Sequence, residues 1–317
     1  MKQVTITLSI AKRDEAFDNM IARLSQYATL QVVGLSDYSL EGVDLFIGKK
    51  LDEKTLATAD SLKAVFAYKT GVDDFPIEAL KARGIAIYNS HADSKIIAEY
   101  ALGLAVSLVT RISEFDRKLR EGIWYDLDNR YWKSIFSMKV GLVGYGHIGR
   151  YIHGFLKTNR IDAYTLDRGH GYTDITAVKT LEELVDTCDI VILSLPKTPD
   201  TDHLFDEAML RRMKGKFIVN VGRSNAIDQG ALYSLLKEEY LAGAAIDTWD
   251  EKPKKETERL MPSAYRFETL DNVILSPHAA MRVENGHRNY VDDVTENVIR
   301  YLTGAAPQNA VDLNKGY

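Results

Sequence analysis

The chain has 317 residues, of which 45% are hydrophobic and 27% are charged, and its net charge is −5. This composition is typical of a globular protein and excludes a disordered or low-complexity chain. The sequence shows no clustered positive charge of the kind by which proteins bind nucleic acids or membrane surfaces. The length fits two domains.

Cys188 is the single cysteine, so the chain can form neither an internal disulfide nor a cysteine-based zinc site, and no metal site is expected. It precedes an apolar run, which favours a buried thiol over a reactive one. The N-terminus lacks the apolar stretch of a signal peptide, and the longest apolar segment is far shorter than the ~20 residues of a membrane helix. We therefore expect a cytoplasmic protein.

The first hundred residues alternate short apolar runs with amphipathic segments. Helices are predicted around 17–27, where apolar residues recur at helical spacing, and at 77–82, which Gly84 ends. A long apolar helix is predicted at 96–112, whereas the aromatic-rich segment 116–137 fits neither pattern. Strands are predicted at 4–8, 30–35, 44–47, 64–68 and 85–88.

A second alternating series begins at Lys139. Its strands are predicted at 139–143, 163–166, 190–195, 217–221, 244–246 and 273–275. Helices are predicted at 151–156, 180–187, 229–238 and 289–302. Short apolar strands that alternate with helices predict parallel sheets covered by helices on both faces, which is an α/β fold.

The glycine-rich turn after the first strand of this series has the pattern G-x-G-x-x-G, between a strand and a helix. Gly144 would permit the tight turn, Gly146 would let the backbone approach a pyrophosphate, and Gly149 would let helix and strand pack closely. The pyrophosphate would then sit at the helix N-terminus, near His147 and Ile148.

Asp167 ends the next predicted strand, 18 residues after Gly149 (167 − 149), close to the usual position of the acid that binds the ribose hydroxyls. A carboxylate there repels a 2′-phosphate and favours NAD over NADP. Arg168 follows immediately and keeps NADP open, because an arginine accommodates that phosphate.

Six further segments together resemble the D-isomer-specific 2-hydroxyacid dehydrogenase family over nearly the whole chain. The segments are Gly71-Val72-Asp73, Ile97-Ala98-Glu99, the stretch 189–201, Asn220-Val-Gly-Arg223, Gly243-Ala-Ala-Ile-Asp247 and Ser276-Pro277-His278. The resemblance implies a Rossmann NAD-binding domain (100–284) inserted into a flavodoxin-like substrate domain (1–99 and 285–317). It also implies an active site in the cleft between them and a homodimer.

The resemblance assigns catalytic roles that the chemistry supports. Arg223 follows a strand end, and its planar fork can hold a 2-oxo acid carboxylate bidentately. His278 is the expected acid/base, since its ordinary pKa of ~6.5 suits proton exchange near neutrality. Asp247 resembles the acid that holds the nicotinamide carboxamide. The remaining histidines are not expected to transfer the proton, and a solvated ring is expected for His153.

The N-terminal domain is expected to contribute substrate contacts. By resemblance, backbone amides around Thr70, Gly71 and Val72 would bind the substrate carboxylate. Asp93 stands in a cleft-facing loop where the family often has a neutral polar residue. A carboxylate there is unfavourable beside an anionic substrate unless it binds a hydroxyl or amine, and Lys69 could offset its charge.

One position departs from the family. The glutamate that usually partners the histidine precedes a proline, and here Lys252 occupies that place in Asp250-Glu251-Lys252-Pro253. A positive charge beside His278 would lower its pKa, whereas an acid raises it. Either the loop is shifted by one residue and Glu251 is the partner, or the acid partner is absent and activity is weak, altered or lost.

The sequence thus predicts an oxidoreductase that transfers a hydride between NAD(H) and a small D-2-hydroxy or 2-oxo acid. The alternative is an inactive or weak NAD(H)-sensing regulatory protein of the same fold, which the missing glutamate supports. The intact Arg223 and His278 favour the enzyme. The substrate side chain cannot be read from the sequence.

Overall fold

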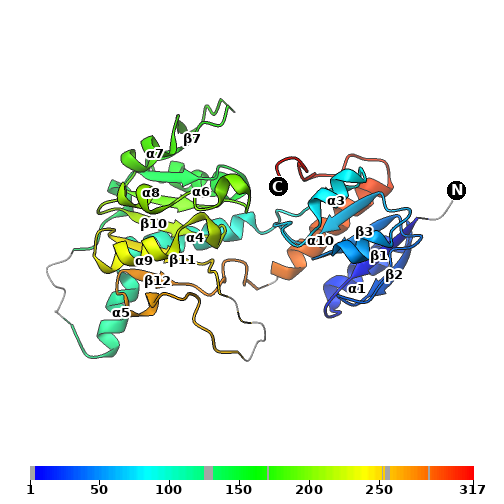
Figure 1. The fold of residues 1–317 in the computed structure, drawn as a ribbon, viewed down its shortest axis with the longest axis horizontal. Helices are drawn as coiled ribbons and strands as arrows, with labels where there is room; N and C mark the ends of the chain where they lie inside the picture. The colour runs from blue at the N-terminus through cyan, green and yellow to red at the C-terminus, as the bar shows by residue number, and fades with distance from the viewer. Residues whose placement is uncertain (1–3, 125–130, 170, 252, 254–257, 285) are drawn as a thin grey trace. The chain divides into compact units, whose positions relative to one another are not determined.

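The computed structural model describes residues 4–124, 131–169, 171–251, 253, 258–284 and 286–317. They form two compact units, of which unit 1 comprises Met1–Asp93 with Val283–Tyr317 and unit 2 comprises Ser94–Arg282. The sequence places the corresponding boundaries at 99/100 and 284/285. Unit 2 is one continuous segment inserted into unit 1 (Figure 1).

Unit 1 is a five-stranded parallel sheet with the order β2-β1-β3-β4-β5, which is the flavodoxin-like order. Its strands are β1 (Thr5–Ser9), β2 (Thr29–Val33), β3 (Leu45–Gly48), β4 (Ala64–Ala67) and β5 (Ala86–Tyr88). Its helices are α1 (Glu15–Leu24), α2 (Glu53–Ala57), α3 (Ile77–Ala82) and α10 (Gly286–Leu302). The late helix α10 packs on α1 and β4, so the last part of the chain completes the core of the first.

Unit 2 is a seven-stranded parallel sheet with the order β12-β11-β10-β9-β6-β7-β8. From β6 the sheet runs outward through β7 and β8 on one side and β9 to β12 on the other, which is the Rossmann order with one added strand. The strands are β6 (Val140–Val143), β7 (Ala163–Leu166), β8 (Thr176–Val178), β9 (Ile190–Leu193), β10 (Phe217–Asn220), β11 (Gly243–Ile246) and β12 (Val273–Leu275). The prediction of two doubly wound parallel sheets is confirmed.

The helices of unit 2 lie on both faces of its sheet (Figure 1). They are α4 (Ser94–Val109), α5 (Ile112–Arg120), α6 (His147–Thr158), α7 (Leu181–Thr187), α8 (Glu207–Arg211) and α9 (Gln229–Lys237). Alternate residues of a strand enter opposite hydrophobic cores, as the period of two requires. In β9, Ile190 and Ile192 join the core under α4 and α6, whereas Val191 and Leu193 join the other core.

The predicted single helix at 96–112 is wrong. Helix α4 ends at Val109, and Arg111 takes a left-handed conformation with φ 57° before α5 begins. The Arg111 guanidinium binds both carboxylate oxygens of Glu114, at 2.7 and 2.6 Å, and so fixes the corner. Helix α5 therefore also occupies the start of the segment that fits no sequence pattern.

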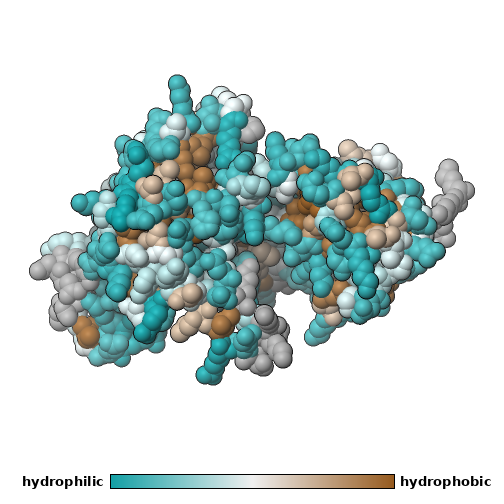
Figure 2. Space-filling view, viewed as in Figure 1, coloured by the Kyte–Doolittle hydropathy of each residue, from teal (hydrophilic) through white to brown (hydrophobic). Residues whose placement is uncertain are grey.

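The surface and the single cysteine are those of an ordinary globular protein. The face drawn in Figure 2 is mostly hydrophilic, with hydrophobic residues visible in limited areas. Cys188 is fully buried, and burial raises the pKa of its thiol to about 12, so the expected buried thiol is confirmed. No single described helix is long and apolar enough to cross a membrane. Only α4 and α5 together pass that test, as a pair bent by 62°.

Candidate active site

The candidate residues of unit 2 lie at one edge of its sheet. Gly144 follows β6, Asp167 follows β7, Arg223 follows β10, Asp247 follows β11 and His278 follows β12. All these strands are parallel, so their carboxyl ends meet at the same edge. Ligands bind at this edge in open α/β sheets, next to the point where the strand order reverses, which here lies between β6 and β9.

The glycine turn has the geometry of an anion cradle. Gly144 has φ 106°, and a Cβ there would lie 2.9 Å from the Ser194 carbonyl oxygen. A Cβ on Gly149 would overlap the Gly144 carbonyl oxygen, whereas one on Gly146 would meet nothing within 4 Å. Helix α6 begins at this turn with a bond of 3.0 Å from the Arg150 N–H to the Gly146 carbonyl, and a helix N-terminus favours an anion.

A cluster of three polar side chains, two of them buried, adjoins this turn. The Tyr145 hydroxyl donates to Asp174 Oδ2 at 2.9 Å and lies 2.6 Å from His153 Nδ1. His153 is 6% exposed, so the solvated ring expected for it is wrong. Sequence reasoning missed the cluster because its members lie 8 and 29 residues from Tyr145 and carry no motif.

The strand end at Asp167 carries an exposed carboxylate. Its Oδ1 accepts a hydrogen bond of 2.9 Å from the Gly169 N–H, which turns the chain immediately after β7. Arg168 is also exposed at this turn. The side chain of His147, within the glycine turn, stays neutral near pH 7 because burial and the Arg150 charge lower its pKa.

The loop that carries Arg223 is shaped by Asn220. The Asn220 side chain accepts from the Gly222 N–H at 3.0 Å and donates to the Arg223 carbonyl at 2.9 Å. Gly222 passes so close to β9 that a Cβ there would lie 2.6 Å from the Leu195 nitrogen. Arg223 itself is partly exposed and donates one bond of 3.0 Å to the Gly222 carbonyl. Asn220 thus shapes the loop that carries Arg223; it belongs to the motif found in the sequence, where it was assigned no role.

The loop that carries His278 is fastened by Asp247, which is 1% exposed. The carboxylate of Asp247 accepts from the Ser276 hydroxyl and from the N–H groups of Ala279 at 2.7 Å and Ala280 at 3.2 Å. These bonds flank His278, whose backbone is left-handed with φ 55° and whose residue is exposed. Asp247 therefore orients the histidine loop, and its contact with a nicotinamide stays a prediction.

Two aromatic residues also bond to Ser276 in the loop that carries His278. The Trp249 Nε1–H donates to the Ser276 carbonyl at 2.9 Å, and the Tyr100 hydroxyl lies 2.8 Å from Ser276 Oγ. Sequence reasoning assigned neither residue a role, since Tyr100 lies 176 residues away in α4.

The role of Glu251 stays a prediction. Its backbone N–H donates to the Pro262 carbonyl at 3.1 Å. No hydrogen bond or ion pair between its carboxylate and His278 is found in the described part of the chain. Lys252, on which the alternative depends, lies outside the described residues.

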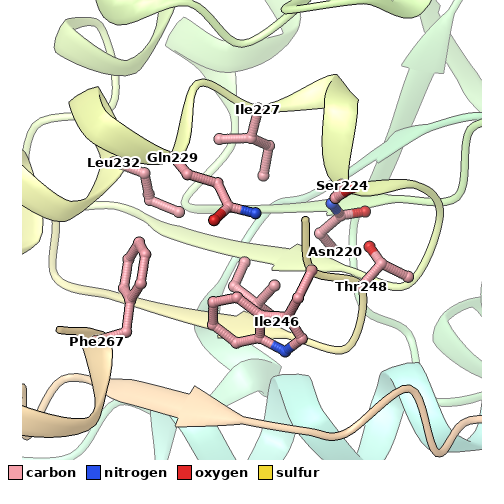
Figure 3. Close-up of a pocket in the computed structure, with 9 residues that line it drawn as sticks. Asn220, Ser224, Ile227, Gln229, Leu232, Ile246, Thr248 and Phe267 are labelled. Carbon is pink, nitrogen blue, oxygen red and sulfur yellow. The ribbon is translucent and has the colours of Figure 1, made fainter. Parts of the chain in front are cut away.

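A small cavity of about 10 Å³ is lined in part by Asn220 and Ser224, on either side of Arg223. Figure 3 shows the Gln229 side chain reaching into it from the start of α9, between Leu232 and Ser224. Gln229 Nε2 and Thr248 Oγ1 are buried there without a hydrogen-bond partner among the described residues. The volume is far too small for a substrate, so this cavity is a packing feature.

In unit 1 the predicted residues follow β4 and β5. Thr70 donates from its hydroxyl to the Ser90 carbonyl at 2.9 Å, and Val72 is buried. Asp93 is 1% exposed, and its Oδ1 accepts from the Asn289 side chain at 3.1 Å. Its Oδ2 has no partner among the described residues, and burial raises the pKa of Asp93 although the Asn289 bond opposes this.

Comparison with known proteins agrees with this geometry. Residues 102–280 match the family described as D-isomer specific 2-hydroxyacid dehydrogenase, NAD binding domain. A glyoxylate reductase of Korarchaeum cryptofilum is 32% identical over 273 residues, which cover 83% of this chain and 80% of that protein.

Solved structures share the fold over almost the whole chain. A Pyrococcus horikoshii protein has 25% identity and a TM-score of 0.84, covering 98% of this chain and 96% of that one. The NADPH-dependent glyoxylate/hydroxypyruvate reductase of Sinorhizobium meliloti, solved with NADP and malonate, has 22% identity and a TM-score of 0.78, covering 99% and 98%. The chain therefore belongs to the D-isomer specific 2-hydroxyacid dehydrogenase family, and residues 102–280 form its NAD-binding domain.

Proposed function

We propose that the protein is an NAD-dependent dehydrogenase of a small D-2-hydroxy acid and reductase of the matching 2-oxo acid. The observation that carries this proposal is the common sheet edge that holds the glycine turn, Arg223, Asp247 and His278. A cofactor cradle, a carboxylate anchor and a proton donor are the three groups that this reaction requires.

The residues of the glycine turn fit a dinucleotide. The open space at Gly146 would admit the pyrophosphate, and the N–H groups of His147, Ile148 and Gly149 would donate to it. Asp167 would accept hydrogen bonds from the ribose hydroxyls, which favours NAD, whereas Arg168 would tolerate NADP. When bound, the nicotinamide ring supplies or accepts the hydride, and Asp247 would contact its carboxamide.

Arg223 would bind the substrate and His278 would exchange a proton with it. The Arg223 guanidinium binds the carboxylate through two parallel hydrogen bonds and so fixes the neighbouring carbonyl carbon. Protonated His278 donates its proton to the carbonyl oxygen during reduction, and the neutral ring removes the hydroxyl proton during oxidation. Glu251 would raise the pKa of His278 if it approaches the ring, whereas Lys252 in that place would lower it.

Unit 1 would supply further contacts. We include in the proposal the backbone of Thr70, Gly71 and Val72 as donors to the substrate carboxylate. Asp93, although 1% exposed, stays in the proposal as a residue near the substrate, and it would act there as a neutral acid or as an acceptor for a hydroxyl or amine, because an ionised carboxylate repels a 2-oxo acid.

The test measures NADH and NADPH oxidation with glyoxylate, hydroxypyruvate and pyruvate. His278→Gln should lower kcat by about 10²–10⁴-fold, while Arg223→Lys should raise KM by more than tenfold because one lysine cannot bind both oxygens. Both variants should bind NADH within twofold of the wild type. NADH binding with no turnover of any 2-oxo acid would instead support a sensor of NAD(H). Turnover by His278→Gln at the wild-type rate would refute the assignment of the proton donor.

We also propose that the protein works as a cytoplasmic homodimer. Helix α5 and the residues after it expose large hydrophobic side chains that a monomer would leave in water. They are Ile112, Leu119, Trp124, Tyr131, Trp132 and Phe136. Tyr131 is 88% exposed, and replacing it and Phe136 by serine should shift sedimentation from dimer to monomer. The matched change Tyr151→Ser, on exposed α6 surface, should leave the dimer intact.

A further inference from the structure

Unit 1 contains a cavity of about 460 Å³ to which no role has been assigned. It lies at the carboxyl ends of β1, β3 and β4, where Ala11, Lys49 and Tyr68 follow these strands. This is the edge at which parallel α/β sheets bind ligands, and the volume is that of a small-molecule site.

Four lysines line this cavity, against two carboxylates that already have partners. The lysines are Lys12, Lys49, Lys50 and Lys69. Asp74 forms an ion pair with Lys69, and Asp14 caps α1 through the Phe17 N–H and lies 3.3 Å from His287 Nε2. Lys12, Lys49 and Lys50 form no ion pair with a residue that the structure describes. The cavity therefore carries an excess of positive charge.

Lys49 combines this charge with an aromatic contact. Its Nζ lies 5.2 Å from the centroid of the Tyr68 ring, so the ammonium sits over the aromatic face. Burial and the nearby Lys69 ammonium lower the pKa of Lys49, which is the response of a cation that lacks a counter-charge. An anion in the cavity would supply that charge.

Beside the charged groups, the cavity has an apolar part of its wall, which includes Phe17, Leu35 and Tyr68. The rings of Phe17 and Tyr68 meet edge to face with centroids 5.5 Å apart, and Leu35 lies on the rim. The Tyr68 hydroxyl donates to the Ser9 carbonyl at 2.8 Å, which fixes its ring. This rigid surface can hold the carbon skeleton of a ligand while the lysines hold its charged end.

We propose that this cavity binds a small organic anion, whose phosphate or carboxylate group contacts Lys12, Lys49 and Lys50 and whose carbon skeleton packs on Phe17 and Tyr68. The anionic group is either the second acidic group of the substrate or part of a separate small effector. The assignment of the anion to the substrate rests on the proposed function. The binding of an anion in the cavity rests on the residues of unit 1 alone.

The binding experiment titrates the full-length protein with inorganic phosphate and follows calorimetric heat and the NMR signals of ¹³C-methylated lysines. Phosphate should bind and raise the pKa of Lys49. Lys49→Gln should weaken phosphate at least tenfold, and Lys49→Glu should abolish its binding, because each loses a charge-assisted contact. Lys81→Gln, at an exposed lysine of α3 outside the cavity, should bind as the wild type does.

The kinetic experiment distinguishes the two sources by comparing 2-oxoglutarate, which has a second carboxylate, with glyoxylate, which has none. If the substrate supplies the anion, Lys49→Gln lowers kcat/KM for 2-oxoglutarate at least tenfold and leaves glyoxylate within twofold. If a separate effector supplies it, both substrates are unchanged and only phosphate binding is lost. The proposal is overturned if the wild type binds no phosphate and shows no such selectivity, or if Lys81→Gln and Lys49→Gln weaken phosphate binding to the same extent. If the wild type turned over no 2-oxo acid, the proposed function would be refuted. The phosphate titration would still test whether the cavity binds an anion.

Discussion

Replacing Gly149 by alanine puts a methyl group against the backbone where α6 crosses the glycine turn. Its Cβ would lie closer than 3.0 Å to the Gly144 carbonyl oxygen, whereas ordinary contact begins at 3.4 Å. The obstructing atom belongs to the backbone, so the helix or the turn itself must move, and no side-chain rotation can relieve the overlap.

The expected cost is about 1–3 kcal/mol of unfolding free energy, the range for overpacking a close contact. For unit 2 this corresponds to a fall in Tm of roughly 2–4 °C per kcal/mol. NADH affinity should fall as well, because the displaced helix N-terminus no longer aims its N–H groups at the pyrophosphate.

Two other glycines of the same region supply matched controls. The added Cβ of Gly146→Ala meets nothing within 4 Å, so the free energy of unfolding should stay within about 1 kcal/mol of the wild-type value. The methyl group would, however, lie where the pyrophosphate approaches. It should therefore weaken NADH at least tenfold without loss of stability. Gly154→Ala, exposed in α6 with open space around it, should raise stability by up to about 1 kcal/mol and leave NADH binding unchanged.

The assay combines urea unfolding followed by tryptophan fluorescence with fluorescence titration of NADH. A Gly149→Ala protein as stable as the wild type would refute the packing argument. Wild-type NADH affinity in Gly146→Ala would refute the placement of the pyrophosphate.

Three further predictions concern buried polar groups. Asp247→Asn should lower the unfolding free energy by about 1–3 kcal/mol in urea titrations, because the N–H groups beside His278 lose their carboxylate acceptor; equal stability would contradict the anchoring role. Asp93→Asn should gain stability relative to the wild type at pH 7 but not at pH 3.5. Because the pKa of Asp93 is raised in the folded protein, its ionised carboxylate destabilises the fold fully above the folded pKa. This destabilisation disappears below the unfolded value of ~3.9. Urea midpoints at the two pH values decide this, and a difference independent of pH would exclude it. Thr248→Val should change stability by less than about 0.5 kcal/mol, since no hydrogen bond to a described residue is lost; a cost above 1 kcal/mol in the same titration would mean that the hydroxyl has a partner.

The sequence predicted those elements whose identity depends on local pattern. The apolar runs predicted at 64–68 and 217–221 form the fully buried strands Ala64–Ala67 and Phe217–Asn220, because buried parallel strands need continuous hydrophobic residues. The strand Thr176–Val178 was missed, since it has only three residues and lies at the edge of the sheet. The break between α4 and α5 was missed because Arg111 gives no sequence signal for a left-handed backbone.

The candidate site divides in the same way. Strand ends and the glycine pattern predicted where Gly144, Arg223 and His278 would stand, since the edge of a parallel sheet follows from chain order. The contacts that orient them were not predictable, even where the residue itself was named. Asp247 acts through bonds to residues 29 to 33 positions away, and such pairings depend on how the strands pack rather than on spacing in the sequence.

The insertion of unit 2 has a consequence for how the chain acquires its structure during synthesis. Unit 1 needs Val291, Val294 and Val298 of α10 to close its core against α1, and these residues are made only after all of unit 2. The first 93 residues therefore cannot complete their core, and keep an apolar face uncovered, until α10 is synthesised. The continuous segment Ser94–Arg282 can complete its own core before that. Unit 2 then holds the two parts of unit 1 on one folded body, so that α10 joins a partner already tethered nearby rather than one at the end of a long unfolded loop.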